Sequence, residues 1–288
     1  MRHPLRSTLL LLLLYVAGMG VLNGCQEAAE RRHVQTQKAR DGSMLKEESF
    51  YIKNGKHVLH GTQRLWFKNG QLRRETEYVD GHQHGRMTEW YKSGTKAEEG
   101  TYQNGLREGL WQRWYEGTGG EFSEAAYATK AEEGTYQNGL REGLWQGWYE
   151  GTGAKYWEAT YADGHIVGEK VYWYESGRYR SGLLQGKDLL EGKETYDSEG
   201  HIQRKTRWYP DGRMWMDGTF RKGRKHGTWT YWEPDGTVKA QGEWRDGKPW
   251  EGMCGVRMAS DAGRMFGLLV FEEYHEGRPT GRIAGWGI

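Results

Sequence analysis

The sequence predicts an all-β protein: an elongated, open, single-layer antiparallel sheet made of tandem hairpin repeats of about 24 residues. Glycine spacings of 11, 13 and 11 residues separate Gly70, Gly81, Gly94 and Gly105, and the same series returns from Gly212 to Gly247. Such a half-period fits one short strand and one tight turn, whereas two-helix repeats need about 33 residues. The runs between the glycines alternate Trp, Tyr, Thr and Val with charged residues, which is typical of strands.

Residues 1–24 have the order of a secretory signal peptide. Arg2 and Arg6 precede the apolar run Leu9–Leu22, which is shorter than the roughly 20 residues that cross a bilayer as a helix. The Leu-Asn-Gly-Cys sequence ending at Cys25 resembles the bacterial lipobox, in which the cysteine is lipidated. We therefore expect an exported bacterial lipoprotein anchored through Cys25, with an ordinary signal peptide as the alternative. After the cysteine, Gln26 stands in place of the Asp that would resemble an inner-membrane retention signal of enteric bacteria. We therefore expect the outer membrane, on its periplasmic or surface face, over the inner membrane.

Residues 25–47 follow as a predicted flexible membrane tether. They contain Glu, Arg, Lys and Gln with few large apolar side chains, so they bury too little surface to offset the entropy lost on folding. A flexible chain of this length spans roughly 26 Å. We expect it to hold the repeats close to the membrane.

Residues 48–252 carry the repeats, and their turns follow a common chemistry. Asn-Gly and Asp-Gly pairs tolerate the positive φ angles that hairpin turns need. These pairs are Asn69-Gly70, Asp80-Gly81, Asn104-Gly105, Asp163-Gly164, Asp211-Gly212 and Asp235-Gly236. Each pair predicts the end of one strand and the start of the next.

Aligning the repeats on one glycine gives a tryptophan column five residues later: Trp66, Trp90, Trp114, Trp148, Trp173 and Trp232. Equal offsets place these rings on one face, where neighbouring repeats would stack them into a ladder. The next positions predict an opposite-face column of Phe67, Tyr91, Tyr115, Tyr149 and Tyr174. The second strand type ends in Tyr78, Tyr102, Tyr136, Tyr161, Phe220 and Trp244. We interpret these aromatics as a structural spine, with a ligand-facing role for the tryptophan column as the alternative.

The repeat pattern is interrupted twice. Residues 95–119 return as residues 129–153 with one difference, Arg113 against Gly147. This tandem duplication of 34 residues is not a multiple of the repeat, so it predicts a bulge, a loop or a register defect near residues 117–134. Further on, the segment Leu183–Lys193 reads as an insertion loop.

Residues 253–288 differ in composition from the repeats. A continuous apolar run ends at Phe271, and a last repeat-like turn follows at Gly277. Because the edges of an open sheet invite unwanted strand pairing, we expect this segment to act as a C-terminal cap.

The succession Gly-x-x-x-x-Trp-aromatic, a turn glycine, and aromatic-x-x-Gly resembles the MORN-repeat variant family over residues 48–252. The resemblance implies hairpins added side by side and a role as an interaction scaffold. Bacterial members are often labelled antitoxin-like. The resemblance implies no catalytic residue and no cofactor.

Composition excludes a nucleic-acid partner driven by charge. Lys and Arg number 41 and Asp and Glu 39, and loss of Arg2 and Arg6 with the signal leaves 39 of each sign. No basic surplus then remains to neutralise phosphates. Cys25 and Cys254 are the two cysteines. If Cys25 is acylated, Cys254 has no partner within the chain, and we interpret it as a small buried side chain.

Catalytic and metal-binding chemistry has little support in the sequence. His82 and His84 are the best local metal candidates, but a repeat aligns such residues without any ligand, and we expect no metal site. The pairs Glu98-Glu99 and Glu132-Glu133 fit a solvated strand face better than a general acid and base. Neither a nucleophile elbow nor a phosphate-binding glycine loop occurs. We therefore expect a protein that is not an enzyme and uses no cofactor.

Two functions remain. The first is a membrane-anchored scaffold in the cell envelope that binds a protein partner, in an antitoxin-like manner or otherwise. The alternative is a cell-wall or glycan binder that uses exposed aromatic ladders. This chain's aromatic residues and glycine turns also resemble choline-binding-type cell-wall repeats. The two functions differ in one property, because glycan binding needs aromatic rings that are exposed to solvent.

Overall fold

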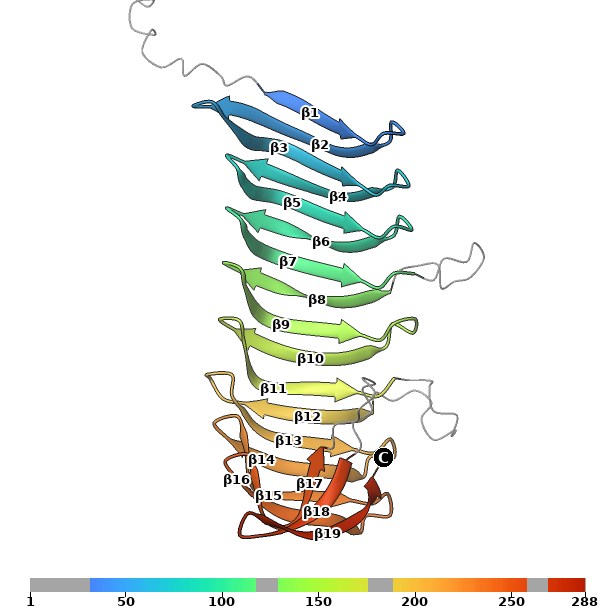
Figure 1. Ribbon diagram of the computed structural model, residues 1–288, viewed down its shortest axis with the longest axis vertical. Coiled ribbons are helices and arrows are strands. Elements are labelled where there is room, and N and C mark those ends of the chain that lie inside the picture. The colour runs from blue at the N-terminus through green and yellow to red at the C-terminus, as the bar shows by residue number, and fades with distance from the viewer. Residues whose placement is uncertain (1–31, 118–128, 176–188, 258–268, 288) are drawn as a thin grey trace, which may run out of the picture.

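The computed structural model describes residues 32–117, 129–175, 189–257 and 269–287, and within them nineteen strands form one antiparallel sheet. Each strand pairs with the next along the chain, so the strands follow one another in chain order along an elongated body (Figure 1). The prediction of an all-β, open sheet of hairpins is confirmed. No helix among the described residues is long and apolar enough to span a membrane.

The strands are seven to eleven residues long in most of the body. The first ten are β1 (His33–Lys38), β2 (Met44–Lys53), β3 (Lys56–Trp66), β4 (Leu72–Val79), β5 (His82–Trp90), β6 (Lys96–Gln103), β7 (Leu106–Trp114), β8 (Lys130–Gln137), β9 (Leu140–Trp148) and β10 (Lys155–Ala162). The others are β11 (His165–Trp173), β12 (Leu190–Tyr196), β13 (Ile202–Trp208), β14 (Met214–Arg221), β15 (Arg224–Trp232), β16 (Val238–Arg245), β17 (Lys248–Arg257), β18 (Leu269–His275) and β19 (Arg278–Gly287).

Two kinds of turn join the strands, one along each long edge of the sheet. On one edge the turn has two residues, and both have positive φ, as at Asp80 (50°) and Gly81 (84°). This conformation matches the twist of the flanking strands. On the other edge the glycine alone has positive φ, and the residue before it accepts a hydrogen bond, as Asp235 Oδ1 does from the Thr237 amide at 2.8 Å. The shared Asx-Gly motif therefore serves two geometries.

Strand alternation divides the side chains between two faces. The aromatic face carries the buried rings, among them Trp111, Trp145 and Trp229. The polar face carries charged and amide side chains, among them Glu99 and Gln112.

The structure corrects the predicted tether. Residues His33–Lys38 form β1, and β2 begins at Met44, so the sheet starts well before residue 48. Every residue of β1 is exposed. Main-chain hydrogen bonds to β2 hold this strand, and these need no apolar side chain. The signal peptide, Cys25 and the rest of the tether through residue 31 lie outside the described residues.

The sheet continues across the duplication without a register defect. Gly109 of β7 opposes Tyr136 of β8, as Gly85 of β5 opposes Tyr102 of β6. The Tyr115 amide donates to the Thr129 carbonyl at 2.9 Å, and this bond closes the connection in the way that Tyr91 and Thr95 close an ordinary turn. The predicted register defect is therefore wrong. The predicted loop falls on residues 118–128, outside the described residues.

The predicted insertion loop is also corrected. Leu190–Lys193 belong to β12, which pairs with β11 in the usual register, Gly168 against Tyr196. Residues 183–188 lie outside the described residues. Both insertions therefore fall on the same edge of the sheet, because a longer connection costs little there, whereas an extra residue inside a strand would turn every following side chain to the other face.

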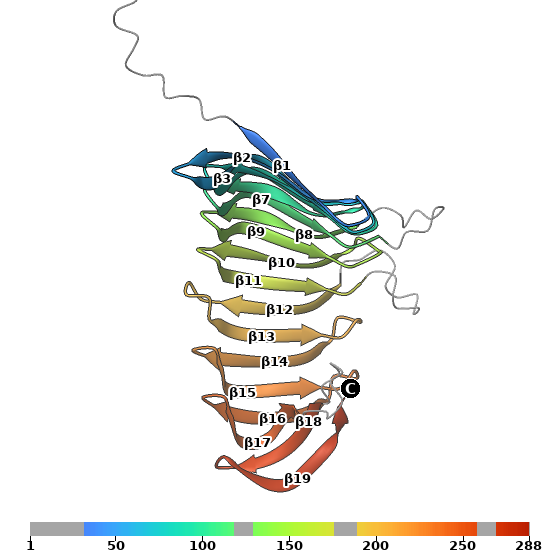
Figure 2. The same ribbon diagram turned by 45° about the horizontal axis from the view of Figure 1, so that its top comes forward.

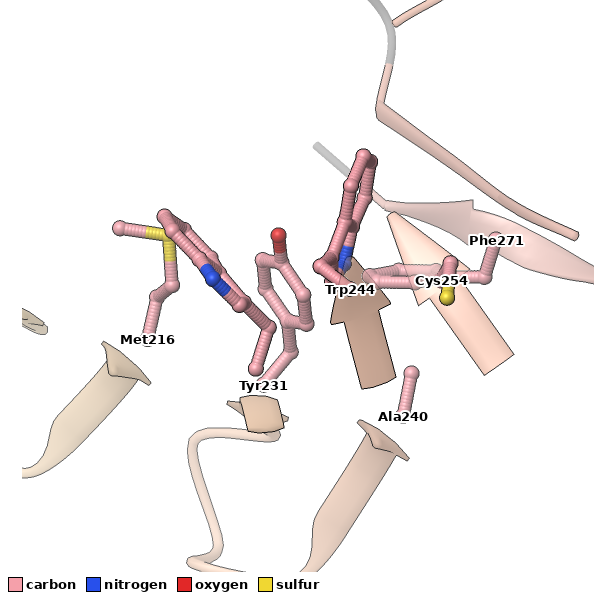
Figure 3. Packing of buried hydrophobic residues seen from close by; sticks show 7 residues of the cluster. Met216, Tyr231, Ala240, Trp244, Cys254 and Phe271 are labelled. Carbon is pink, nitrogen blue, oxygen red and sulfur yellow. The ribbon is translucent and has the colours of Figure 1, made fainter. Parts of the chain in front are cut away.

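The C-terminal strands leave the line of the sheet. Figures 1 and 2 show β17, β18 and β19 turning across the end of the body. The ring of Phe271 on β18 packs against Tyr231 on β15, with centroids 5.0 Å apart. Figure 3 shows Trp244, Cys254 and Phe271 beside Tyr231 in this cluster. The sheet thus curls toward its aromatic face and forms a small core at this end.

Candidate functional site

The aromatic face is built from a tryptophan on one strand that lies over a glycine on the next. A Cβ on Gly100 would stand 2.2 Å from the Trp111 ring, and a Cβ on Gly134 would stand 2.1 Å from Trp145. Trp229 covers Gly218 in the same way. Each indole Nε1 donates to a main-chain carbonyl, with Trp111 to Thr101 at 3.2 Å as the example. These indoles, two residues after the aligned glycines, form the buried spine that the sequence analysis assigned to other columns.

Tyrosines and arginines complete this face. Tyr136 stands edge-on between Trp111 and Trp145, with centroids 5.9 and 5.0 Å away. The guanidinium groups of Arg107 and Arg141 each lie 3.9 Å from the ring of their tryptophan. Trp111 is only 2% exposed, although the sheet has a single layer, because these neighbours cover it. The face is therefore a rigid, preassembled surface of rings and guanidinium groups.

Each of these two arginines pairs with a carboxylate, and Glu132 is shared with Arg113. Arg107 lies 3.1 Å from Glu98, and Arg141 lies 2.8 Å from Glu132. The arginine side chains keep 32% and 29% of their surface exposed. Burial alone would lower the pKa of Arg141, but Glu132 reverses this and raises it. The guanidinium groups are therefore charged, fixed and reachable from solvent.

Charged residues interrupt the spine in the middle of the sheet. Lys170, Glu194 and Lys205 stand in register where other repeats place tryptophan and glycine. Glu194 is 6% exposed and accepts hydrogen bonds from four side chains. The donors are Tyr172 at 3.1 Å, Tyr196 at 2.8 Å, Lys205 at 3.0 Å and Arg207 at 2.8 Å. Burial raises the pKa of Glu194, but the Lys205 charge and the donors outweigh it and lower the pKa to about 2.

The polar face carries an unbroken row of directly opposed side chains. It begins at Glu47, Arg64 and Glu75 and continues through β16. The row continues as Thr88, Glu99, Gln112, Glu133, Gln146, Glu158, Val171, Lys193, Thr206, Asp217, Thr230 and Gln241. Neighbours bond to one another, as Gln112 does to Glu133 at 2.9 Å. This face therefore satisfies most of its own charges.

The predicted tryptophan column lies at the strand ends and is half-buried. The ammonium group of Lys96 stands 5.0 Å from the Trp114 ring centre, and Lys130 and Lys155 stand over Trp148 and Trp173 at 5.1 and 5.2 Å. In the part of the chain that the structure describes, no ring contact joins two members of the column. The column has a member on every second strand only. Since neighbouring strands are about 4.8 Å apart, consecutive rings of the column are about 9.6 Å apart. The expected stacked ladder is therefore a series of separate rings, three of them under lysine.

The following tyrosine column is a hydrogen-bond ladder. Tyr91, Tyr115 and Tyr149 each donate their hydroxyl to the carbonyl of the next tryptophan in the column, at 2.8, 3.0 and 2.8 Å. Phe67 occupies the first place without a hydroxyl, beneath Arg73 at 5.8 Å. The ladder continues through Tyr174 and Tyr209, which bond to Trp208 and Trp232 at 2.7 Å.

Trp208 and Tyr209 extend both columns, and the glycine alignment missed them. Their distance from the turn glycine Gly212 is the same as that of Trp90 and Tyr91 from Gly94. Aligning on the turn instead of on the strand glycine would have found them. The insertion before β12 hides them from the fixed period.

Histidine and glutamate side chains directly before the aligned strand glycines hold the two-residue turns. His60 Nδ1 lies 3.2 Å from Asp80 Oδ1, and His84 Nδ1 lies 3.3 Å from Asn104 Oδ1. Glu108 accepts from the Asn138 amide at 2.8 Å. His82 is exposed beside its turn. No group of three His, Cys, Asp or Glu side chains in the described ranges is arranged to hold a metal ion.

The remaining titratable candidates are placed as follows. Glu98 pairs with Arg107 on the aromatic face and Glu99 with Arg86 at 2.8 Å on the polar face, so the sheet separates their carboxylates. Cys254 is fully buried and free. Burial raises the pKa of its thiol, which disfavours the reactive thiolate.

Comparisons with known proteins support the repeat assignment. Three segments, residues 59–80, 83–104 and 225–246, match the sequence model of the MORN repeat variant. Each match runs through a strand, the longer turn and the following strand up to a two-residue turn. No curated protein matches the sequence.

Similar solved structures include those titled "Crystal Structure of TcdB2-TccC3" and "Crystal Structure of TcdB2-TccC3-Cdc42", each 10% identical with a TM-score of 0.20. A third, "Crystal Structure of TcdB2-TccC3-TEV", is 12% identical with a TM-score of 0.20. The alignments cover 88 to 90% of this chain but 16 to 17% of the others. The chain thus spans about a sixth of their length.

Proposed function

We propose that this protein is a non-enzymatic scaffold in the cell envelope that holds a partner protein against the aromatic face of its sheet. Its MORN-type repeats suggest an interaction scaffold. The observation that carries the choice of face is the pair of guanidinium groups stacked on buried rings at Arg107 and Arg141, whose side chains are about one-third exposed. Arg, Tyr and Trp dominate the binding energy of protein interfaces.

Rigidity favours this face further. The Arg107 and Arg141 side chains are already held by their carboxylates and rings, so a partner would immobilise few additional rotamers. The polar face, by contrast, bonds many of its side chains to one another, as Gln112 does to Glu133 and Thr206 to Asp217. A partner there would have to break existing pairs.

The anchor belongs to the same proposal. A lipid on Cys25 would fix the scaffold to the membrane as an exported lipoprotein, on the outer rather than the inner membrane. Two or more acyl chains suffice for stable anchoring. An antitoxin-like role is the narrower form, in which the partner is a toxin.

Glycan binding is the second candidate, and it would use the half-buried tryptophan column. The lysines over Trp114, Trp148 and Trp173 occupy one side of these rings. A sugar would have to displace them or use the other side. We therefore rank this function second.

Site-specific photocrosslinking tests whether a partner protein binds the aromatic face and not the polar face. A photoreactive residue replaces Arg113 on the aromatic face, 58% exposed, or Arg86 on the polar face, 68% exposed. We expect the full-length protein in intact cells to crosslink to one discrete protein from position 113 and not from position 86. Crosslinks from position 86 alone would contradict the proposed face. Sedimentation with peptidoglycan and quenching of tryptophan emission, without any protein crosslink, would favour the glycan alternative.

A further inference from the structure

The charged interruption of the aromatic face contains more cations than its carboxylates can pair. Lys205 and Arg207 both bind Glu194. Lys170, in register with Glu194, forms no ion pair among the described residues. Its ammonium group lies instead over the rings of Trp157 and Tyr172, at 4.5 and 5.1 Å. Burial lowers the pKa of Lys170, which reflects the cost of this environment for a positive charge.

The row of residues beside Lys170 and Glu194 contains carboxylates in the earlier repeats but not in the later ones. Directly opposed residues run across the strands as Glu89, Glu98, Arg113, Glu132, Gly147, Trp157, Tyr172, Gly192 and Arg207. In the earlier repeats this row supplies Glu98 to Arg107 and Glu132 to Arg141. In the later repeats the corresponding places hold Trp157 and Gly192. The later repeats therefore lack these carboxylates and carry their cations in other places, Lys170 and Lys205 in the tryptophan row and Arg207 in the row of Arg113.

Gly192 also affects how Arg207 packs beside Lys170. A Cβ there would stand 2.2 Å from the Arg207 guanidinium, so glycine lets Arg207 fold flat against the sheet. Glu191 is the other carboxylate near Arg207, and burial raises its pKa although the Arg207 charge lowers it. The ammonium group of Lys170 therefore lies over the rings of Trp157 and Tyr172 and near the Arg207 charge, without an ion pair among the described residues.

We propose that Lys170, Lys205 and Arg207 form a binding site for an aspartate or glutamate side chain of the partner, which replaces the carboxylate that Glu98 and Glu132 supply within the earlier repeats. This deepens the proposed function and rests on it. Charge-assisted hydrogen bonds to a partly desolvated carboxylate are the strong kind. A single acidic side chain would pair Lys170 and relieve the excess positive charge.

Titration of the full-length protein in nonionic detergent tests the site. The probes are a hexaglutamate peptide, a hexaglutamine peptide and inorganic phosphate, followed by tryptophan emission and calorimetry. We expect saturable binding of hexaglutamate only, weakened at least about tenfold by Lys170→Met. Lys96→Met is the matched control, because Lys96 also stands over a ring, 5.0 Å from Trp114, but is bonded to Glu99 at 2.9 Å. It should change the affinity less than about twofold.

Chemical labelling of wild-type lysines, read by mass spectrometry, keeps the test independent of variant folding. Hexaglutamate should protect Lys170 and leave Lys96 unchanged. No binding, equal weakening by both substitutions, or binding of phosphate without the peptide would overturn the site. If the crosslinked partner at position 113 persists while hexaglutamate fails to bind, this inference is wrong and the proposed function stands.

Discussion

The hydroxyl of Tyr174 donates to the carbonyl of Trp208 at 2.7 Å, although 34 residues separate them. The same bond joins Tyr91 to Trp114 over 23 residues. An insertion therefore changes the distance along the chain and leaves the contact intact. The columns of this protein are defined by the sheet and not by the sequence period.

Each hydrogen bond of the tyrosine ladder should contribute separately to the free energy of unfolding. Tyr91→Phe removes the bond to the Trp114 carbonyl and should lower the free energy of unfolding by about 1 kcal/mol. Urea unfolding, followed by circular dichroism, measures it. Tyr156→Phe is the control, because Tyr156 is 36% exposed and its hydroxyl makes no bond among the described residues. Equal losses for the two variants would contradict the ladder.

The glycines beneath the buried indoles should not tolerate a methyl group. Gly134→Ala places its Cβ 2.1 Å from the Trp145 ring, and overpacking of this kind costs about 1 to 3 kcal/mol. Trp145→Leu should destabilise by itself but create space. The double variant should therefore lose less stability than the two single losses together, measured by urea unfolding. Simple additivity would show that the indole does not clash with the new methyl group.

Stability should depend on the charge of Glu194 in acid. Its pKa is lowered to about 2 in the folded protein, against an unfolded value of about 4.3. The stabilisation is thus complete above about pH 5 and is lost as pH falls from about 4 toward 2, on the order of 2 kcal/mol.

Glu194→Gln provides the comparison for this window. The variant should be less stable than the wild type near neutral pH, and the difference should shrink as the pH falls through the window. Urea midpoints at several pH values measure it. A difference that stays constant down to about pH 2 would mean that Glu194 does not carry this dependence.

The C-terminal strands should protect the end of the sheet. Deleting residues 253–288 removes Phe271 from Tyr231 and leaves a free edge, so we expect aggregation, measured by light scattering after size-exclusion chromatography. Phe271→Ala, a milder change, should cost about 3 to 5 kcal/mol. A soluble, monomeric truncation would show that these strands are not a cap.

The proposed lipid anchor predicts the location of the protein. Cys25→Ala should move it from the membrane fraction to the soluble fraction, because the residue proposed to be acylated is lost. Cell fractionation and immunoblotting measure this. Cys254→Ala removes the other cysteine and should leave the protein in the membrane fraction. Retention of the Cys25 variant would remove the anchor from the proposed function.

Glycine spacing, Asx-Gly turns and aromatic alternation determined the hairpins and their period, because each depends on a few residues close in the chain. Turn glycines such as Gly81 and Gly105 were predictable for this reason. The place of β1 was not, since its pairing with β2 uses main-chain bonds that its composition does not record.

Only the tertiary structure decided which indoles are buried and where charge is left over. Trp111 is buried because Gly100 lies opposite it on the neighbouring strand. Beside Lys170, Trp157 and Gly192 take the places where earlier repeats carry glutamate. Both facts depend on cross-strand register, which joins residues that the chain keeps apart. The curl that brings Phe271 onto Tyr231 has the same cause, and no local pattern in the sequence specifies it.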